Sequence, residues 1–385
     1  ELLKHLNSVM KKRNPGVLMI AEESTAWPKI TGSLEDDGLG FDLKWNMGFM
    51  NDFLTYIGYD PYFRAHHHGE LTFSMIYAYS ENFMIVFSHD EVVHGKATMI
   101  GKMPGTIEDK FSNLRATYAY MMTHPGKKLL FMGQDIAEFK EFDETRETEW
   151  ALLSQDAHKG VNQLVKDLNK LYREKPALHA LDTSPEGFQW INCISPEKCM
   201  LSFLRKSEKE EEVLVVVVNF ANVEQEFTVG VPYEGKYREI LNTDDKCYGG
   251  LGRVNGQALF VEEEETDGNP YSFKMTSAPL SASIFAFAPY TEAERAQIEK
   301  KKAKIAARLK AEEAQREAEE AKAQALKARE EAEEAKRLAD EAEVRAREAE
   351  KKALAESKRA QEEAGKYEAL QKEETAAKSS PSKKK

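Results

Sequence analysis

The stretch that most constrains the fold is a run of four apolar residues, Met84 to Phe87, that leads directly into Ser88-His89-Asp90-Glu91. A buried strand of a parallel sheet typically has such a continuous apolar run. In α/β barrels, the side chains that perform chemistry follow the carboxyl ends of the strands. Residues 17–21 and the polar residues after them, Glu22-Glu23-Ser24-Thr25, repeat the pattern. The sequence therefore predicts two parallel strands whose polar ends lie on the same edge of one sheet.

Glu22 and Asp90 are the two carboxylates that this pattern singles out, and they are 68 residues apart. A (β/α)8 barrel of about 250 residues uses roughly 31 residues for each strand and its helix, so this spacing is close to two units. Helical periodicity and further apolar runs alternate from residue 1 to residue 175. We therefore expect an α/β fold in which residues 1–175 form about half of a (β/α)8 barrel.

The hydrophobic pattern and the composition change twice in the remaining residues. Residues 176–290 contain short apolar segments separated by charged or glycine-containing turns, a spacing that predicts an antiparallel β-sandwich of about 100 residues. From residue 291 the composition shifts to Ala, Glu, Lys and Arg, and we expect residues 291–385 to form a helical or coiled-coil tail with a loose end at residues 379–385.

The tail contains a seam of alanine with alternating steps of four and three residues. Such a seam is the heptad pattern of a coiled coil, but alanine buries little area at each contact. A solitary charged helix, a coiled coil with itself or a partner through residues 300–370, and disorder therefore all stay open. The alanines lie at 307, 311, 314, 318, 321, 325, 328, 332, 335, 339, 342, 346, 349 and 353.

Charge and cysteine content exclude several classes of function. The net charge is −12, yet residues 291–385 carry 25 basic and 23 acidic side chains, so the acidic excess lies in residues 1–290. An acidic surface disfavours nucleic acid, and no apolar run is long enough to span a membrane. Three cysteines without a CxxC pair indicate a reducing, cytoplasmic compartment and no structural zinc. Adjacent histidines at residues 66–68 chelate poorly, so we expect no metal and no cofactor.

Four ordered motifs carry a resemblance to a known family. Read together, they resemble the 1,4-α-glucan branching enzymes of the α-amylase superfamily, over roughly residues 1–290. Residues 291–385 have no counterpart in that family. The motifs are Ala21-Glu22-Glu23-Ser24-Thr25, Lys44-Trp45-Asn46-Met47-Gly48, Ser88-His89-Asp90-Glu91-Val92-Val93-His94-Gly95-Lys96 and Leu129-Leu130-Phe131-Met132-Gly133.

The resemblance implies roles for individual residues. Glu22 would be the general acid/base on barrel strand five, and Asp90 the third carboxylate of the site on strand seven. His89 would contact the sugar in the cleavage subsite. The nucleophilic Asp of the family would lie upstream, so we expect this chain to be the C-terminal half of the barrel and to be inactive alone. Gln134-Asp135 departs from the Asn-Glu more usual in relatives.

The implied chemistry is cleavage of an α-1,4 link with retention, which needs two carboxyl groups on opposite sides of the bond. Glu22 would protonate the leaving oxygen and later deprotonate the acceptor. A 6-hydroxyl of another chain as acceptor makes an α-1,6 branch in glycogen or starch, whereas water as acceptor makes the protein a hydrolase. Trp45 could offer a flat apolar face to a glucose ring.

Other interpretations stay open for each residue. Glu22 alone could be a solvated loop residue, Glu23 is equally available, Asp90 could cap a helix, and Trp45 could be a core residue. Two alternative functions also stay open: an amylase-type hydrolase, and a non-catalytic glucan-binding or scaffold protein whose tail recruits a partner.

Overall fold

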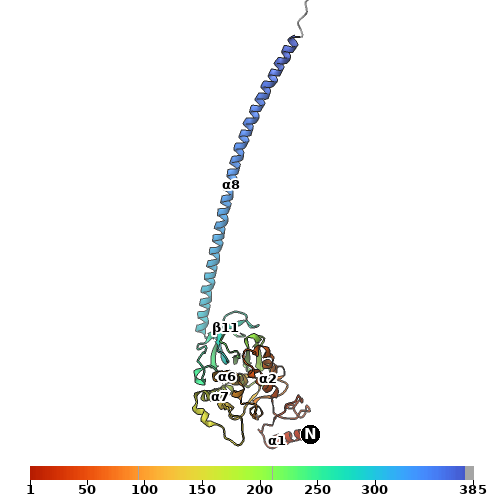
Figure 1. Cartoon of the computed structure of the whole chain (residues 1–385), viewed down its shortest axis with the longest axis vertical. Helices are drawn as coiled ribbons and strands as arrows, with labels where there is room; N and C mark the ends of the chain where they lie inside the picture. The colour runs from red at the N-terminus through yellow and green to blue at the C-terminus, as the bar shows by residue number, and fades with distance from the viewer. Residues whose placement is uncertain (94, 210, 378–385) are drawn as a thin grey trace, which may run out of the picture. The chain divides into compact units, whose positions relative to one another are not determined.

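A computed structural model describes residues 1–93, 95–209 and 211–377 of the protein (Figure 1). The chain divides into two units, Glu1–Thr291 and Glu292–Lys385. Residues 378–385, which include the predicted loose end, lie outside the described residues.

The first unit begins with a parallel sheet whose strands follow the chain order β1-β2-β3-β4. These strands are β1 (Ile20–Ala21), β2 (Leu43–Trp45), β3 (Phe83–Phe87) and β4 (Lys127–Leu130). Strand β3 is almost wholly buried, as its apolar run predicts. Strand β1 is shorter than the expected 17–21, because the N–H of Met19 donates to the side chain of Asp42 at 2.8 Å instead of to a neighbouring strand.

Helices connect β2 to β3 and β3 to β4, whereas a loop without helix connects β1 to β2, and capping residues explain where α2 and α6 begin. Asn46 caps α2 by accepting a hydrogen bond from the N–H of Phe49 at 2.8 Å, and Thr106 with Asp109 forms a capping box at the start of α6. The helices are α1 (Leu2–Arg13), α2 (Met47–Gly58), α3 (His68–Thr72), α4 (Ser74–Tyr77), α5 (Met99–Lys102), α6 (Ile107–Thr123) and α7 (Asp156–Glu174). The single-turn 3-10 helices are η1 (Arg64–His67), η2 (His89–Val92), η3 (Gln134–Ile136), η4 (Trp150–Ser154), η5 (Pro176–Leu178), η6 (Pro185–Gly187), η7 (Pro196–Lys198) and η8 (Lys246–Tyr248).

An antiparallel β domain follows. Its six-stranded sheet has the order β10-β9-β12-β7-β6-β5, and a two-stranded ribbon, β11-β8, packs over it around Phe273 and Phe285. The strands are β5 (Phe188–Asn192), β6 (Met200–Lys206), β7 (Val213–Asn219), β8 (Gln225–Val231), β9 (Lys236–Asn242), β10 (Leu259–Phe260), β11 (Tyr271–Ser277) and β12 (Ser281–Ala288).

One core joins the parallel sheet to the β domain, because α6 is buried on nearly all sides between them. Aromatic rings fill this junction. The ring centroid of Tyr120 in α6 lies 5.2 Å from that of Phe53 and 6.2 Å from that of Phe203. Both predicted domains, 1–175 and 176–290, therefore lie within the first unit, and the boundary between them stays a prediction.

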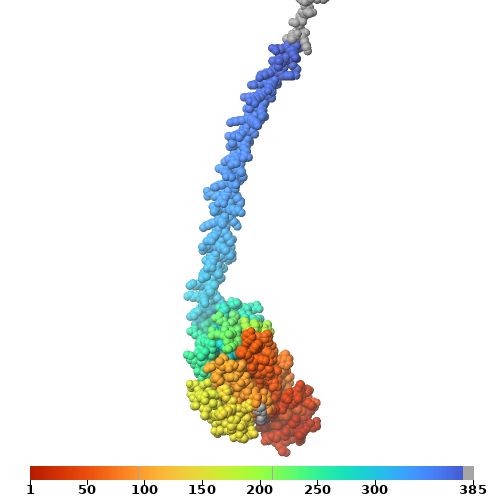
Figure 2. All heavy atoms as spheres, in the orientation of Figure 1, coloured from red at the N-terminus to blue at the C-terminus, as the bar shows by residue number. Residues whose placement is uncertain are grey.

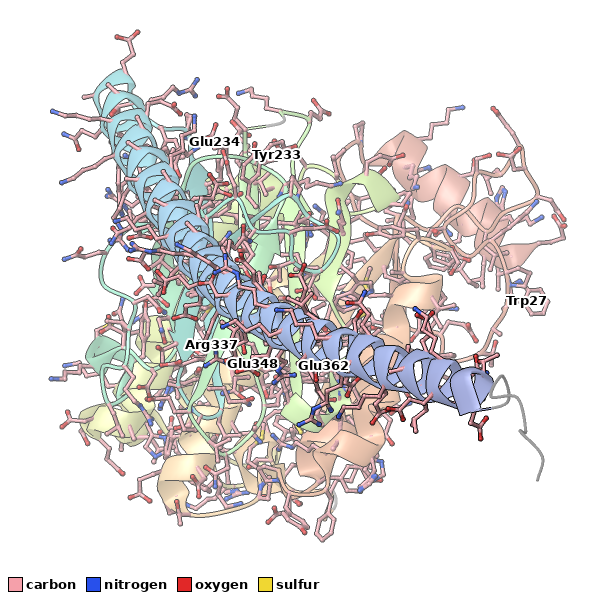
Figure 3. All side chains as sticks on the ribbon, turned by 90° about the horizontal axis from the view of Figure 1, so that it is seen from above. Trp27, Tyr233, Glu234, Arg337, Glu348 and Glu362 are labelled. Carbon is pink, nitrogen blue, oxygen red and sulfur yellow. The ribbon has the colours of Figure 1, made fainter. Side chains whose placement is uncertain are left out.

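The second unit consists of helix α8 (Glu292–Ala377), 86 residues long. Ion pairs one turn apart run along it, such as Arg308 with Glu312 at 2.9 Å and Arg347 with Glu343 at 2.7 Å. In Figure 3 the labelled side chains Arg337, Glu348 and Glu362 project outward from this helix. No helix in the described part of the chain is long and apolar enough to cross a membrane. Whether α8 pairs with a second helix stays a prediction.

Candidate functional site

The polar residues singled out in the sequence follow the carboxyl ends of the parallel strands. Glu22 comes directly after β1, Asn46 after β2, and His89 and Asp90 form the turn η2 after β3. Because the four strands are parallel, these ends lie on the same edge of the sheet. The pairing register matches Ala21 with Lys44 and Lys44 with Phe83, so Asp90 lies further along the strand direction than Glu22.

His89 and Asp90 are brought together. His89 Nε2 lies 3.2 Å from Asp90 Oδ1, and the two side chains are 43% and 47% exposed, so both can reach a ligand from solvent. The imidazole also lies against Phe131, which follows β4, with ring centroids 5.8 Å apart. The end of β4 therefore helps to orient the histidine beside the carboxylate.

Glu22 and Glu23 are neighbours with different surroundings. Glu23 is 2.9 Å from Lys44 Nζ, and it accepts a further hydrogen bond from the N–H of Thr25 at 2.9 Å. Hydrogen bonding from Thr25, followed by the contact with Lys44, holds the pKa of Glu23 below its usual value. Glu22 is exposed and, among the described residues, makes no hydrogen bond or ion pair. The side chain of Glu22 is therefore available to a ligand, whereas that of Glu23 is already engaged.

A hollow of about 670 Å³ lies beside Glu22. It is lined by α1, β1 and the segment 22–41, and Asp90 and His89 are not among its lining residues. The structure thus brings Glu22 together with Glu23 and Trp27, and His89 together with Asp90, but it does not join these two groups in one cavity. The segment 1–40, red in Figures 1 and 2, forms a lobe of the first unit.

Trp45 lines a second hollow, of about 690 Å³. Its half-buried side chain packs partly against the core and partly lines the hollow. Its surroundings are therefore compatible with a core residue and with a contact for a glucose ring. Trp27, Asn46 and Tyr77 also line this hollow and were not singled out from the sequence. The available signal was the long loop of residues 26–40 after β1, since such loops often shape sites.

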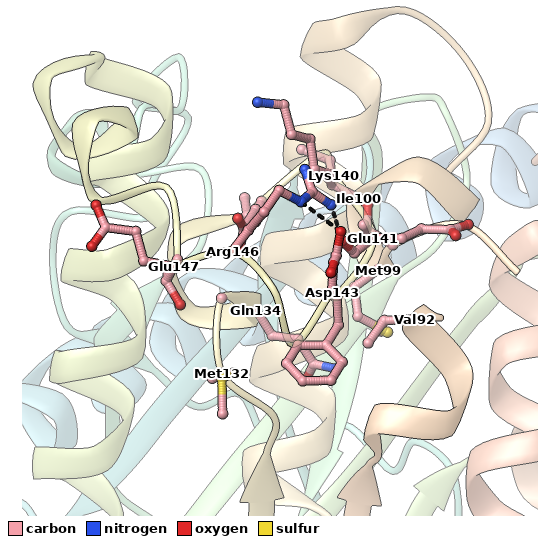
Figure 4. Close-up of a pocket in the computed structure, with 16 residues that line it drawn as sticks. Val92, Met99, Ile100, Met132, Gln134, Lys140, Glu141, Asp143, Arg146 and Glu147 are labelled. Carbon is pink, nitrogen blue, oxygen red and sulfur yellow. Dashed lines mark hydrogen bonds and ion pairs between the residues drawn. The ribbon is translucent and has the colours of Figure 1, made fainter. Parts of the chain in front are cut away.

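A third and much smaller hollow, of about 40 Å³, lies over the segment that follows β4 (Figure 4). Glu141 accepts hydrogen bonds from the N–H groups of Gly95 and Ala97, both at 2.8 Å, and so ties the residues after Asp90 to this segment. Gln134 is buried there, and its Nε2 has no partner among the described residues. Arg146 and Asp143 close one side of the hollow with an ion pair of 2.9 Å.

Two of the three histidines at 66–68 contact other residues of the chain. His67 Nδ1 lies 2.9 Å from Glu70 Oε1, and His68 Nε2 lies 2.8 Å from the carbonyl oxygen of Cys193. Within the residues that the structure describes, no cluster of three or more His, Cys, Asp or Glu is arranged to hold a metal ion.

Comparison with known proteins first defines the class. Residues 190–288 match the alpha amylase C-terminal all-beta domain. Among solved structures, AmyP in complex with maltose has a TM-score of 0.53 at 11% identity, covering 75% of this chain and 62% of that one. The Nostoc punctiforme debranching enzyme has a TM-score of 0.51 at 14% identity, covering 74% and 55%. These likenesses show an amylase-like fold with an α-amylase C-terminal domain.

Within that class, the chain is similar to curated 1,4-alpha-glucan branching enzymes called GlgB. It is 48% identical over 291 residues to that of Cupriavidus necator, covering 75% of this chain and 38% of the relative. It is 47% identical over 285 residues to the enzyme of Geobacillus stearothermophilus, covering 74% of this chain and 45% of the relative. It is 49% identical over 282 residues to that of Aquifex aeolicus, covering 73% of this chain and 45% of the relative. The predicted resemblance is confirmed, and the chain spans less than half the length of the curated relatives it matches.

Proposed function

We propose that this chain forms the C-terminal part of a 1,4-α-glucan branching enzyme, which cleaves an α-1,4 link with retention and transfers the severed chain to a 6-hydroxyl. The observation that carries the proposal is 47% to 49% identity to curated branching enzymes over about three quarters of the chain. The substrate would be an α-glucan such as glycogen or starch. The odd number of cysteines supports a cytoplasmic location.

The proposal includes a half barrel, in which further β/α units complete the sheet. Four parallel strands in chain order, with helices between β2 and β3 and between β3 and β4, resemble consecutive barrel units, although the connection from β1 to β2 contains no helix. Strands β1 and β4 each pair with one neighbour only among the described residues, so the sheet has two edges at which a barrel could continue. Residues 1–175 would form this half barrel, 176–290 the β-sandwich and 291–385 the tail.

Glu22 would protonate the leaving oxygen and then deprotonate the acceptor hydroxyl. In retaining enzymes the acid lies about 5 to 5.5 Å from the carboxylate that attacks the anomeric carbon. That nucleophile would come from the completing β/α units. Glu22 suits the first role because its exposed side chain is available to a ligand, whereas the carboxylate of Glu23 is occupied by hydrogen bonds from Thr25 and Lys44.

Asp90 and His89 would bind the hydroxyl groups beside the reacting carbon. Hydrogen bonds to these hydroxyls strengthen as the sugar approaches the oxocarbenium-like transition state, so the exposed carboxylate and the adjacent imidazole supply stabilisation without attacking. Trp45 would contribute an apolar ring face to a neighbouring glucose unit. No cofactor takes part in these steps.

A chimera tests the proposal. The matched residues of this chain would replace the corresponding residues of the Geobacillus stearothermophilus branching enzyme, which supplies the rest of the protein. The chimera would be incubated with amylose, and new α-1,6 linkages and reducing ends would both be counted.

We expect α-1,6 linkages to accumulate with few new reducing ends. A folded chimera that releases reducing ends without branches would favour the hydrolase. A folded chimera that does neither, while the parent enzyme branches amylose, would favour the non-catalytic alternative.

A further inference from the structure

The segment that follows β4 contacts the turn that carries His89 and Asp90. We call residues 131–146 the clamp segment, and Figure 4 shows part of it. Its first residue, Phe131, lies against His89 with ring centroids 5.8 Å apart. Further along the segment, the ring of Phe142 meets that of Phe131 edge-on, with centroids 5.0 Å apart. The clamp segment therefore folds back on itself beside η2, where the two candidate site residues lie.

Three hydrogen bonds join the clamp segment to η2 and to the loop after it. The N–H of Phe142 donates to the carbonyl oxygen of Val92 at 3.1 Å. The carboxylate of Glu141 accepts from the N–H of Gly95 with one oxygen and from the N–H of Ala97 with the other, both at 2.8 Å. Hydrogen bonds to a carboxylate are stronger than those between neutral groups. One side chain thus fixes the loop after η2 at two backbone points.

The backbone of this loop depends on outside contacts. Gly95 has a φ of 80° and Ala97 has a φ of 65°. Glycine adopts this left-handed region readily, but a residue with a β-carbon does so at a cost. Such a conformation persists only where the surrounding structure holds it, and the N–H of Ala97 is one of the two that Glu141 binds. Removal of the carboxylate should therefore release the loop.

The clamp segment is itself braced by Arg146. The guanidinium donates from Nη2 to the carbonyl oxygen of Glu141 at 3.1 Å, and from Nε to the carboxylate of Asp143 at 2.9 Å (Figure 4). These contacts hold the backbone of Glu141 in place while its side chain reaches the loop.

The chain is thus anchored on both sides of His89 and Asp90. Strand β3 ends at Phe87, whose side chain is fully buried, and the clamp segment holds the chain from Val92 onwards. The side chains of His89 and Asp90 are 43% and 47% exposed, so packing around them does little to fix their place. Their orientation therefore depends on the backbone of η2 and on the contacts that anchor it.

We propose that Glu141 is a positioning residue for the reaction. By holding the loop after η2, it keeps His89 and Asp90 in the orientation that binds the hydroxyl groups beside the reacting carbon. This role rests on the proposed function, and Glu141 itself would not contact the sugar. Because the hydrogen bonds to these hydroxyls strengthen in the transition state, a displaced η2 would lower kcat more than it weakens substrate binding.

The test uses the branching chimera with Glu141→Ala, which removes both acceptor oxygens. Glu144→Ala is the matched control, since Glu144 is an exposed glutamate of the clamp segment and makes no hydrogen bond or ion pair within the described part of the chain. The initial rate of α-1,6 linkage formation would be measured over a range of amylose concentrations, per mole of folded protein.

We expect Glu141→Ala to lower kcat at least about tenfold and to leave KM within about twofold of the parent. The control should leave both within about twofold. A side chain needed only for folding would lower the yield of folded chimera and leave the kcat of the folded protein unchanged.

A second measurement does not depend on catalysis. Amide hydrogen exchange of the full chain would be followed by mass spectrometry, with fragmentation that resolves single residues. We expect Glu141→Ala to raise the exchange rates of Gly95, Ala97 and the residues of η2 at least about tenfold, and Glu144→Ala to leave them within about twofold.

The two measurements separate failure of this inference from failure of the proposed function. If the chimera branches amylose and Glu141→Ala keeps the kcat of the parent, or raises KM alone, the positioning role is wrong and the function stands. If the chimera does not branch amylose, the function is wrong and exchange in η2 decides the rest. Faster exchange in Glu141→Ala would then support its hold on His89 and Asp90, and an unchanged rate would overturn it.

Discussion

Glu22 and Glu23 illustrate how much a single position depends on its surroundings. The two residues carry the same carboxyl group and are adjacent in the sequence, so composition alone does not separate them. Lys44 lies within a buried strand 21 residues later, and its ammonium group reaches Glu23 at 2.9 Å. Together with hydrogen bonding from Thr25, this contact favours the ionised form of Glu23 and engages its carboxylate, whereas the exposed side chain of Glu22 stays available to a ligand.

A second residue-scale consequence concerns His124, which is buried at the end of α6. Its Nδ1 lies 2.9 Å from the carbonyl oxygen of Pro125, which can only accept, so Nδ1 carries the proton and Nε2 accepts from the hydroxyl of Ser74 at 3.0 Å. Burial lowers the pKa of His124 to about 3. The folded protein therefore keeps this imidazole neutral where the unfolded chain would protonate it.

We expect His124 to contribute to acid destabilisation. Its pKa in the unfolded chain is about 6.5, so the unfolded state binds the extra proton between about pH 6.5 and pH 3, and stability falls as the pH falls through this window. Between pH 7 and pH 4.5 this group accounts for roughly 2.5 kcal/mol of lost unfolding free energy. Urea unfolding at the two pH values should show a smaller loss for His124→Asn than for the parent. The exposed His66→Asn is the control. An equal loss of unfolding free energy in the parent and in His124→Asn would contradict the assignment.

At the scale of elements, buried arginines connect the parallel sheet to the β domain. The guanidinium of Arg64, from η1, donates to the carbonyl oxygen of Phe220 at 2.9 Å, and Arg115 of α6 donates to that of Thr243 at 2.9 Å. Arg205 of β6 donates to the carbonyl oxygen of Thr123 in α6 at 2.6 Å and pairs with Asp182 at 2.9 Å, and both charged side chains are almost fully buried. These contacts act together with the aromatic core around α6.

Removing one partner of the Arg205–Asp182 pair should be costly, because the other charge would then stay buried without compensation. We expect Asp182→Asn to lower the free energy of unfolding by about 3–5 kcal/mol in a urea titration. The matched control is Glu312→Gln, which removes the exposed partner of Arg308 in α8 and should change stability by less than about 1 kcal/mol. A loss below 1 kcal/mol for Asp182→Asn would show that the pair does not hold the junction.

The elements themselves were largely predictable, because periodicity and apolar runs are local signals. The apolar run before Ser88 predicted β3, and the helical periodicity that alternates with apolar runs in residues 1–175 predicted helices such as α6 and α7. The contacts between elements were not predictable, since Arg64 meets Phe220 across 156 residues. Likewise, no local pattern indicates that the buried amide of Asn46 caps α2 with its oxygen while its nitrogen has no partner among the described residues.

At the scale of the whole molecule, the proposal predicts that catalysis needs more than this chain. The sheet has an unpaired edge at β1 among the described residues, and apolar side chains lie exposed near it, including Leu2, Leu18 and Ile20. Such an edge is usually paired or covered in a complete fold. Glu22 lines the hollow at this edge, which is where the completing units and their nucleophile would be placed.

The most direct test compares Glu22→Gln with Glu23→Gln in the branching chimera, using the initial rate at which α-1,6 linkages form on amylose. Both substitutions remove one carboxylate of the same size from neighbouring positions, so each controls for the other. We predict that Glu22→Gln lowers the rate at least about hundredfold, the effect of losing a general acid, while Glu23→Gln stays within tenfold of the parent. A chimera that branches normally with Glu22→Gln, or loses its activity only with Glu23→Gln, would contradict the account.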